Sequence, residues 1–505
     1  MIPPMTETAL PQGKPVERLL AWLLPTMPVL VFAFVFWTSL FFMPTMLNAG
    51  DGDLGRHLTV GSLILSSGQI PAHDVFSHTL TGAPLVPHEW LSEVLFALSY
   101  RLAGLNGVAW LTALILASAY AILAIALRRA GVRALVALVA VLFASMVGAV
   151  HMLLRPHIFT LLFFTILLLV LEEYRNADRR RALIVLLPLM VVWANMHGAF
   201  ISGLMLVAFY AVGAALEKER RRLIELAALF VSLVVASWIN PVGIQLLVHS
   251  FAYLGNRFLV NLTVEYQSPD FHAVNVLPFA ALLLLSFAIV GRSGKRLDWT
   301  PLILLVGWSA FALYSTRNIP LYAQVAVIIL APIADAWIDE LLPAAKRFLA
   351  RTDEIDRVSS GWIWAVAVVA LLVGLQMSGD KIDVRGTGNV FDPHVFPIAA
   401  VDSMTGSLPS GNMFNEFNWG GYLLYRLWPQ KQVFIDGQTD FYGETLTREY
   451  LNVINAEPGW ETILDHYQVR WVIISPTRAL AARLDESSAW MRRYADATAV
   501  VWVRR

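Results

Sequence analysis

The chain has 505 residues, of which 57% are hydrophobic and only 15% are charged. A soluble globular protein carries about 25% charged residues, so this composition is typical of a polytopic membrane protein. The formal net charge is zero and there is no cysteine. These counts exclude disulfides, thiolate catalysis and cysteine-ligated metal sites, and they give no reason to expect a nucleic-acid partner.

Eleven apolar segments are predicted to span the membrane, because a helix of roughly 20 residues crosses a hydrocarbon core of ~30 Å. The first lies in an uncharged stretch between Arg18 and Asp51, which is too long for a cleaved signal peptide. The predicted spans are residues 19–43, 105–127, 134–150, 156–171, 182–198, 199–216, 223–239, 273–290, 299–315, 319–337 and 360–378.

The loop charges predict the orientation of these spans. Loops on one side hold 20 lysines and arginines, and loops on the other side hold five. By the positive-inside rule the N-terminus is cytoplasmic and residues 379–505 are extracytoplasmic. The same alternation excludes a span at residues 88–104. We therefore expect an interfacial helix there and a second at 55–66, both within an outer loop of residues 44–104.

The composition changes near residue 379, where polar and apolar residues begin to alternate over short distances. Strands are predicted at residues 411–414, 432–435, 470–474 and 500–503, and helices at 443–454, 459–467 and 476–484. Residues 379–505 are thus predicted to form an extracytoplasmic α/β domain, following a membrane domain of residues 1–378.

Two aspartates, Asp51 and Asp53, lie a few residues beyond the first predicted span. Carboxylates are costly near hydrocarbon, so this pair indicates a function at the outer face. Either carboxylate can act as a general base. Together with His57, four residues after Asp53, they can also hold a divalent cation. The alternative is an Asx-type turn that caps the next helix.

Other polar residues are predicted at the same face, including all eleven histidines, although long outer loops collect polar residues in any case. Arg155 and Arg317 can bind a phosphate or simply extend to the interface. Glu89 can serve a site or only favour a helix N-terminus. The loop of residues 240–272, with Glu265, covers a cleft or is a surface segment. The predicted substrate- or phosphate-binding residues are His57, His88, Glu89, Arg155, His157, His197 and Arg317.

This layout resembles the GT-C superfamily of polytopic glycosyltransferases, such as protein O-mannosyltransferases and the lipid A aminoarabinose transferase, and most of all its bacterial members without an assigned substrate. The resemblance covers the order of segments over nearly the whole chain, but its motifs are short. They are Asp53-Leu54-Gly55-Arg56-His57 after the first span, Leu105-Asn106-Gly107 entering the next, and Leu154-Arg155-Pro156-His157 before a later one.

The resemblance implies a GT-C-like membrane domain that transfers a hexose or pentose from a polyprenyl-phosphate donor. The acceptor would be a lipid, glycan or protein at the outer face of a bacterial inner membrane. Asp53 or Asp51 would deprotonate the acceptor, and Arg155, His157 and Arg317 would balance the leaving phosphate. No cofactor is certain. Mg²⁺ or Mn²⁺ is the candidate metal, with Asp51, Asp53 and His57 as ligands. A transporter or flippase and a non-enzymatic envelope-assembly protein are the competing predictions.

Overall fold

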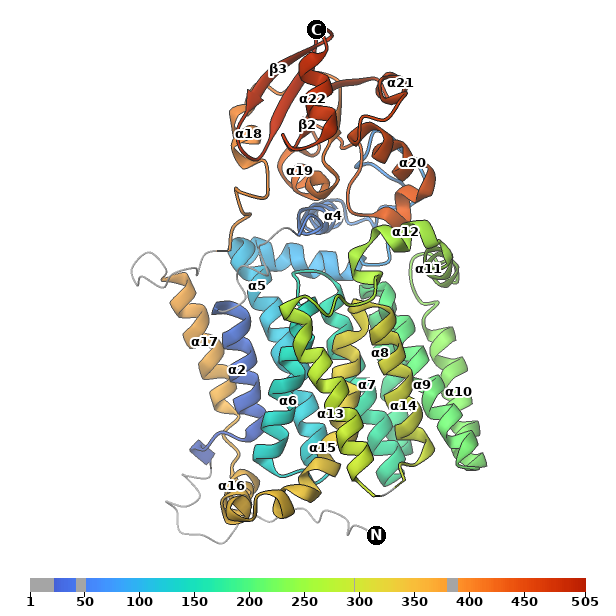
Figure 1. Cartoon of the computed structure of the whole chain (residues 1–505), viewed down its shortest axis with the longest axis vertical. Helices are drawn as coiled ribbons and strands as arrows, with labels where there is room; N and C mark the ends of the chain where they lie inside the picture. Colours follow the sequence, from blue (N-terminus) through green and yellow to red (C-terminus); the bar gives the residue numbers. More distant parts are fainter. Residues whose placement is uncertain (1–21, 42–50, 295, 379–388) are drawn as a thin grey trace.

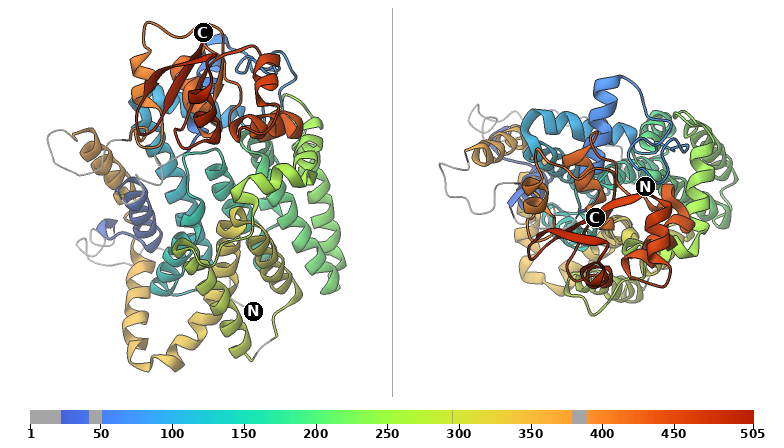
Figure 2. Two further views of the ribbon diagram at one scale, coloured as in Figure 1. Left: turned by 45° about the horizontal axis from the view of Figure 1, so that its top comes forward. Right: turned by 90° about the horizontal axis from the view of Figure 1, so that it is seen from above.

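The computed structural model describes residues 22–41, 51–294, 296–378 and 389–505. A long helical bundle carries an α/β domain at one end (Figure 1). Two further views show that this C-terminal domain lies over the end of the bundle (Figure 2). Both ends of the first predicted span and part of the predicted boundary near residue 379 lie outside the described residues.

A helix corresponds to each of the eleven predicted spans. Six described helical segments are long and apolar enough to cross a membrane. The number becomes seven if the bent pair of helical segments at residues 343–358 and 363–377 counts as one span. The others have 11–17 residues, so the number of spans stays a prediction. The bundle consists of α2 (Met27–Phe41), α5 (Trp90–Arg129), α6 (Ala134–Gly148), α7 (His157–Ala177), α8 (Leu186–Met196), α9 (Ile201–Leu216), α10 (Arg220–Ala236), α13 (Leu277–Arg292), α14 (Trp299–Tyr314), α15 (Ile319–Leu341) and α17 (Ile363–Met377).

Helix α5 bends sharply near one end. Ala103 and Gly104 have non-helical backbone angles, and Gly104 has a φ of 58°, which favours glycine. The part before the bend lies across the end of the bundle, and the part after it runs along the bundle (Figure 1). A helix therefore covers most of the predicted 88–104 segment, while its position at a membrane interface stays a prediction.

Several short helices accompany the bundle. At the end that carries the C-terminal domain are α4 (Leu54–Ser67), α11 (Gln245–Gly255) and α12 (Arg257–Leu262). At the other end, α16 (Lys346–Val358) is joined to the bundle by an ion pair between Arg128 and Asp353. The short 3₁₀ helices are η1 (Ala149–His151), η2 (Arg180–Val185), η3 (Gly198–Phe200), η4 (Val264–Tyr266), η5 (Val274–Val276), η6 (Thr316–Asn318), η7 (Pro343–Ala345) and η8 (Phe417–Trp419).

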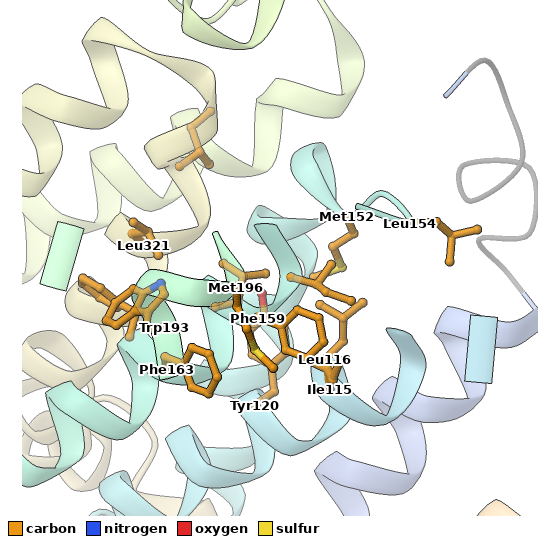
Figure 3. Close-up of a cluster of buried hydrophobic side chains, with 14 of the residues drawn as sticks. Ile115, Leu116, Tyr120, Met152, Leu154, Phe159, Phe163, Trp193, Met196 and Leu321 are labelled. Carbon is orange, nitrogen blue, oxygen red and sulfur yellow. The ribbon is translucent and has the colours of Figure 1, made fainter. Parts of the chain in front are cut away.

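Buried apolar side chains from α5, α7, α8 and α15 pack together in one cluster (Figure 3). Trp193 is fully buried in this cluster. Its indole Nε1 donates to Thr160 Oγ1 at 3.0 Å. A Cβ at Gly203 would lie only 2.6 Å from the Trp193 ring, so α9 packs closely against α8. This core fixes the end of α8, after which His197 follows directly.

The C-terminal domain contains a four-stranded sheet with the order β1-β2-β4-β3. Strands β1 and β2 are parallel, and the other two pairs are antiparallel. Its elements are α18 (Ile398–Ser403), β1 (Asn412–Asn415), α19 (Gly420–Leu427), α20 (Thr439–Ile454), α21 (Trp460–His466), β2 (Val469–Ile474), α22 (Ala479–Glu486), β3 (Trp490–Ala495) and β4 (Val500–Arg504).

The prediction of a strand at residues 432–435 is wrong. Val433 instead forms an isolated bridge with Ser77, in the segment between α4 and α5. Its N–H donates to the Phe76 carbonyl at 3.0 Å, and its carbonyl accepts from the His78 N–H at 3.1 Å. The backbone is thus paired across the two parts of the chain, outside the sheet. Strand β3 was not predicted.

Candidate functional site

The loop that carries Asp51 and Asp53 touches the C-terminal domain through backbone atoms. A Cβ at Gly52 would lie 2.3 Å from the Asn418 carbonyl oxygen, and one at Gly421 would lie 2.0 Å from the Gly52 carbonyl oxygen. Only glycine permits such close approach of two backbones. The start of α4 therefore lies directly on the start of α19, which fixes the aspartate loop relative to the C-terminal domain.

Arg155 lies between three carboxylates, two from the aspartate loop and one from the loop of residues 240–272. Its Nε donates to Asp51 Oδ1 at 2.7 Å, and its Nη1 lies 3.0 Å from Asp53 Oδ2 and 2.9 Å from Glu265 Oε1. Burial raises the pKa of Asp51, although the charge of Arg155 opposes the rise. Burial also acts to raise the pKa of Glu265, but the charges of Arg155 and Arg317, with a smaller contribution from His157, together outweigh it and lower the pKa. One guanidinium thus holds this acidic cluster together.

The two aspartates have different surroundings. The Asp51 side chain is only 2% exposed, and its Oδ1 accepts a hydrogen bond from the Asp53 backbone N–H at 3.0 Å. Asp51 therefore makes the turn that the sequence suggested as the alternative role. Asp53 directly precedes α4, yet its side chain makes no capping hydrogen bond. Its carboxylate lines a cavity and packs against Gly437.

His57 belongs to a buried network between α4, α5 and the C-terminal domain. Its Nδ1 lies 3.2 Å from Glu93 Oε1. Arg56 lies beside the same carboxylate, with Nη1 at 3.5 Å, and its Nε lies 3.2 Å from Asp436 Oδ2. Burial lowers the pKa of His57, but the hydrogen bond with Glu93 and the charge of Glu89 outweigh it and raise the pKa. This network therefore stabilises the imidazolium form of His57 relative to that of a free histidine.

Three histidines lie together at the ends of α6, α7 and α8. The rings of His151 and His157 are 4.2 Å apart, and those of His157 and His197 are 6.4 Å apart. His197 Nδ1 accepts from the Ala199 backbone N–H at 3.2 Å and lies 3.0 Å from Thr160 Oγ1. These contacts place the proton of a neutral His197 on Nε2, which faces Glu89 Oε1 at 3.6 Å.

Arg317 lies in the short turn before α15, with its guanidinium 4.5 Å from the centre of the Tyr266 ring. Among the residues that the structure describes, no carboxylate forms an ion pair with it. Arg155, in contrast, has three such partners. A partly buried cation that is stabilised by an aromatic face retains its capacity to bind an anion.

A further cluster lies at the border with the C-terminal domain. His249 on α11 donates from Nε2 to Asp440 Oδ2 at 2.7 Å. The Nδ1 of His88, just before α5, lies 3.9 Å from the same oxygen. Burial acts to raise the pKa of Asp440, but the His249 hydrogen bond and the charges of both histidines lower it to about 2. Asp440 is therefore ionised at neutral pH.

These groups surround one cavity of about 980 Å³ between the bundle and the C-terminal domain. This volume is large enough for a drug-sized or larger ligand. Its walls combine the polar groups above with apolar residues of α9 and α14, such as Met205, Trp308 and Phe311. The loop of residues 240–272 contributes Tyr253, Val264 and Glu265 to the cavity wall. We call this segment the covering loop.

Eight of the nine predicted site residues line this cavity, and Asp51 lies behind it. The lining residues are Asp53, His57, His88, Glu89, Arg155, His157, His197 and Arg317. The prediction did not include Arg56, Glu93, His249, Asp436 or Asp440. Asp436 and Asp440 lie far from Arg56 and His249 in the sequence, so local patterns could not predict these contacts.

Two groups of side chains in the described part of the chain have ligand atoms that converge as a metal site requires. They are His88, His249 and Asp440, and His57, Glu89 and Glu93. The predicted set of Asp51, Asp53 and His57 is not one of them, and the Arg155 guanidinium lies between its two carboxylates. Binding of Mg²⁺ or Mn²⁺ by that set stays a prediction.

The whole arrangement of helices and C-terminal domain is similar to solved archaeal structures. The apo oligosaccharyltransferase of Archaeoglobus fulgidus superposes with a TM-score of 0.56 at 12% identity, covering 88% of this chain and 69% of that one. This chain has the GT-C fold. The same enzyme tethered to an acceptor peptide with an NVT sequon gives a TM-score of 0.55 at 14% identity, covering 91% and 69%.

A third GT-C structure, archaeal AglB in complex with an inhibitory peptide and a dolichol-phosphate, gives a TM-score of 0.56 at 12% identity over 89% of this chain and 69% of that one. Neither a protein-family model nor the sequence of any curated protein matches the chain. At such low identity the comparisons establish the fold alone. Any activity must be argued from the residues of this chain.

Proposed function

We propose that the chain is a glycosyltransferase that moves a sugar from a polyprenyl-phosphate donor to a hydroxyl acceptor. One observation carries this proposal: the Asp53 carboxylate, free of any capping role, lines the same cavity as Arg317, a cation without an ion-pair partner among the described residues. A base and an anion-binding group that face one space are what transfer from a phosphate leaving group requires. The GT-C fold, with its dolichol-phosphate complex in AglB, supports the same reading.

In the proposed reaction, Asp53 takes the proton from the acceptor hydroxyl as its oxygen attacks the anomeric carbon. The carbon–oxygen bond to the phosphate breaks on the opposite side of the sugar, and the phosphate leaves with the bonding electrons. The configuration at the anomeric carbon is therefore inverted. Acceptors of the lipid, glycan and protein classes all offer such a hydroxyl.

We assign different tasks to the charged residues. Asp51 and Arg155 position Asp53, because Arg155 bonds both carboxylates and Asp51 is buried behind the cavity. Arg317 balances the leaving phosphate, since its charge is not already neutralised by an ion pair among the described residues. His157 and His197 form the cavity wall beside it. The donor would enter from the outer leaflet of a bacterial inner membrane, along the apolar side chains of α9 and α14.

The decisive experiment substitutes Asp53→Asn and measures transfer of labelled sugar from a panel of polyprenyl-phosphate hexoses and pentoses. We expect at least a 10²-fold loss, the lower range for removing a general base. Asp270→Asn is the matched control, because Asp270 is an exposed aspartate in the loop of residues 240–272. Full activity of the Asp53→Asn protein would contradict the assignment of the base.

A further inference from the structure

His88, His249 and Asp440 come from three segments that meet at the rim of the cavity. His88 precedes α5, His249 lies on α11 of the covering loop, and Asp440 lies in the first turn of α20. Their side chains are 17–24% exposed, so an ion can reach them from solvent. Direct contacts between α12 and α20 already bring the loop and the domain together at this point.

The spacing of these side chains suits a metal ion. Their ligand atoms all lie within 4.8 Å of one another. A zinc ion, with bonds of about 2.0–2.2 Å, holds neighbouring tetrahedral ligand atoms about 3.3 Å apart. The observed separations from Asp440 Oδ2, 2.7 Å to His249 Nε2 and 3.9 Å to His88 Nδ1, lie on either side of that value. Small rotations of the side chains therefore complete the geometry.

The donor set also selects the kind of ion. Two imidazole nitrogens and one carboxylate oxygen suit zinc and its transition-metal neighbours, whereas magnesium and calcium prefer oxygen ligands alone. His88 Nδ1 now lies 3.2 Å from the Val86 carbonyl oxygen, a contact that the ion would replace. The other nitrogen, Nε2, lies 3.8 Å from Glu89 Oε1. Glu89 can thus orient His88 as a second-sphere carboxylate.

We propose that His88, His249 and Asp440 bind one zinc-class transition-metal ion, which fastens the C-terminal domain to the covering loop and to the start of α5. Three protein ligands leave one position of a tetrahedral ion open, and a water molecule would fill it. This site serves to hold segments together, and it is independent of the proposed sugar transfer. Its loss would leave the aspartate loop, which contacts α19, in place.

The test begins with purified full-length protein in detergent, stripped by a chelator and dialysed. Titration with Zn²⁺ followed by elemental analysis is expected to give one tightly bound ion per chain. His249→Ala and Asp440→Asn should each weaken binding by at least 100-fold, whereas His272→Ala should bind as the wild type does. His272 is the matched control, since it is an exposed histidine of the same loop.

Two further measurements distinguish loss of the metal site from misfolding of a variant. Co²⁺ bound to wild-type protein should give the visible absorption of a tetrahedral site with nitrogen and oxygen ligands. Zn²⁺ should raise the melting temperature of the wild type and of His272→Ala, and not that of His249→Ala. Absence of stoichiometric binding to the wild type would overturn the proposal. Undiminished binding in His249→Ala, together with its loss in His57→Ala, would also overturn it and place the ion at the His57, Glu89 and Glu93 group.

Discussion

A Cβ atom added at Gly437 would lie 1.7 Å from Asp53 Oδ1, so the Asp53 carboxylate rests directly on the backbone of the C-terminal domain. Arg155 holds the other side of the same carboxylate, with Nη1 at 3.0 Å from Oδ2. The proposed base is thus positioned from one side by the bundle and from the other by residues almost 400 positions later in the chain. This contact gives the C-terminal domain a direct effect on the site.

The substitution Gly437→Ala should displace Asp53, because no side chain fits between the backbone and the carboxylate. A misplacement of about 1 Å can lower a rate by about 10²-fold, and we expect a loss of kcat of that order. Gly255→Ala is the control, since a Cβ there meets no atom within 4 Å. The transfer assay measures both. Equal kcat values for the two variants would show that the contact does not position Asp53.

Removal of Arg155 should destabilise the protein, because Asp51 would remain buried and lose its ionic partner. We expect Arg155→Met to lower the free energy of unfolding by about 3–5 kcal/mol, as for other broken buried ion pairs. The double variant Asp51→Asn, Arg155→Met should recover part of this loss. Denaturant unfolding in detergent compares the wild type, Asp51→Asn, Arg155→Met and the double variant. Strictly additive losses in the double variant would mean that Asp51 and Arg155 are not coupled.

Local patterns predicted much of this molecule. The lengths of the apolar segments predicted the helices. The loop charges predicted that Asp53, Arg155 and Arg317 lie at one face. The structure places these three around one cavity. Hydropathy alone could not predict which helices are long enough to span the membrane. Helix α8, for example, ends just before His197 because of packing in the core around Trp193.

Contacts between distant segments were beyond the reach of sequence patterns. Val433 was predicted to join the sheet because its neighbours are apolar, yet it pairs with Ser77. Arg56 reaches Asp436, and His249 reaches Asp440. Strand β3 escaped prediction because it lies at the edge of the sheet with exposed arginines in its middle, which hides the alternation of apolar residues.

Arg317→Gln should weaken donor binding and leave folding intact. The guanidinium has no ion-pair partner in the described part of the chain, so its removal leaves no buried carboxylate unpaired. Loss of one charged hydrogen bond to a phosphate costs about 1.5–3 kcal/mol, and the KM for the donor should rise about 10- to 100-fold. Arg257→Gln, at an exposed arginine of the loop of residues 240–272, is the control. An unchanged KM would remove Arg317 from the donor site.

The predicted topology can be tested directly because the natural chain has no cysteine. Single cysteines at the exposed positions Ser488 and Ser360 lie in the C-terminal domain and near the other end of the bundle, respectively. A membrane-impermeant maleimide applied to intact spheroplasts should label Ser488→Cys, and it should label Ser360→Cys only after lysis. Labelling of Ser360→Cys alone before lysis would invert the orientation and place the cavity inside the cell.

The pKa of His57 is raised in the folded protein, which makes stability depend on pH in a defined direction. Burial opposes the imidazolium, but Glu93 and Glu89 outweigh it. Because the folded state binds the proton more tightly, this contribution is fully present below the unfolded value of 6.5 and is lost as pH rises through the folded pKa. The melting temperature should therefore fall above pH 6.5 more steeply in the wild type than in His57→Gln. His394→Gln, at an exposed histidine, should retain the wild-type slope, and a His57→Gln slope equal to it would exclude His57 as the titrating group.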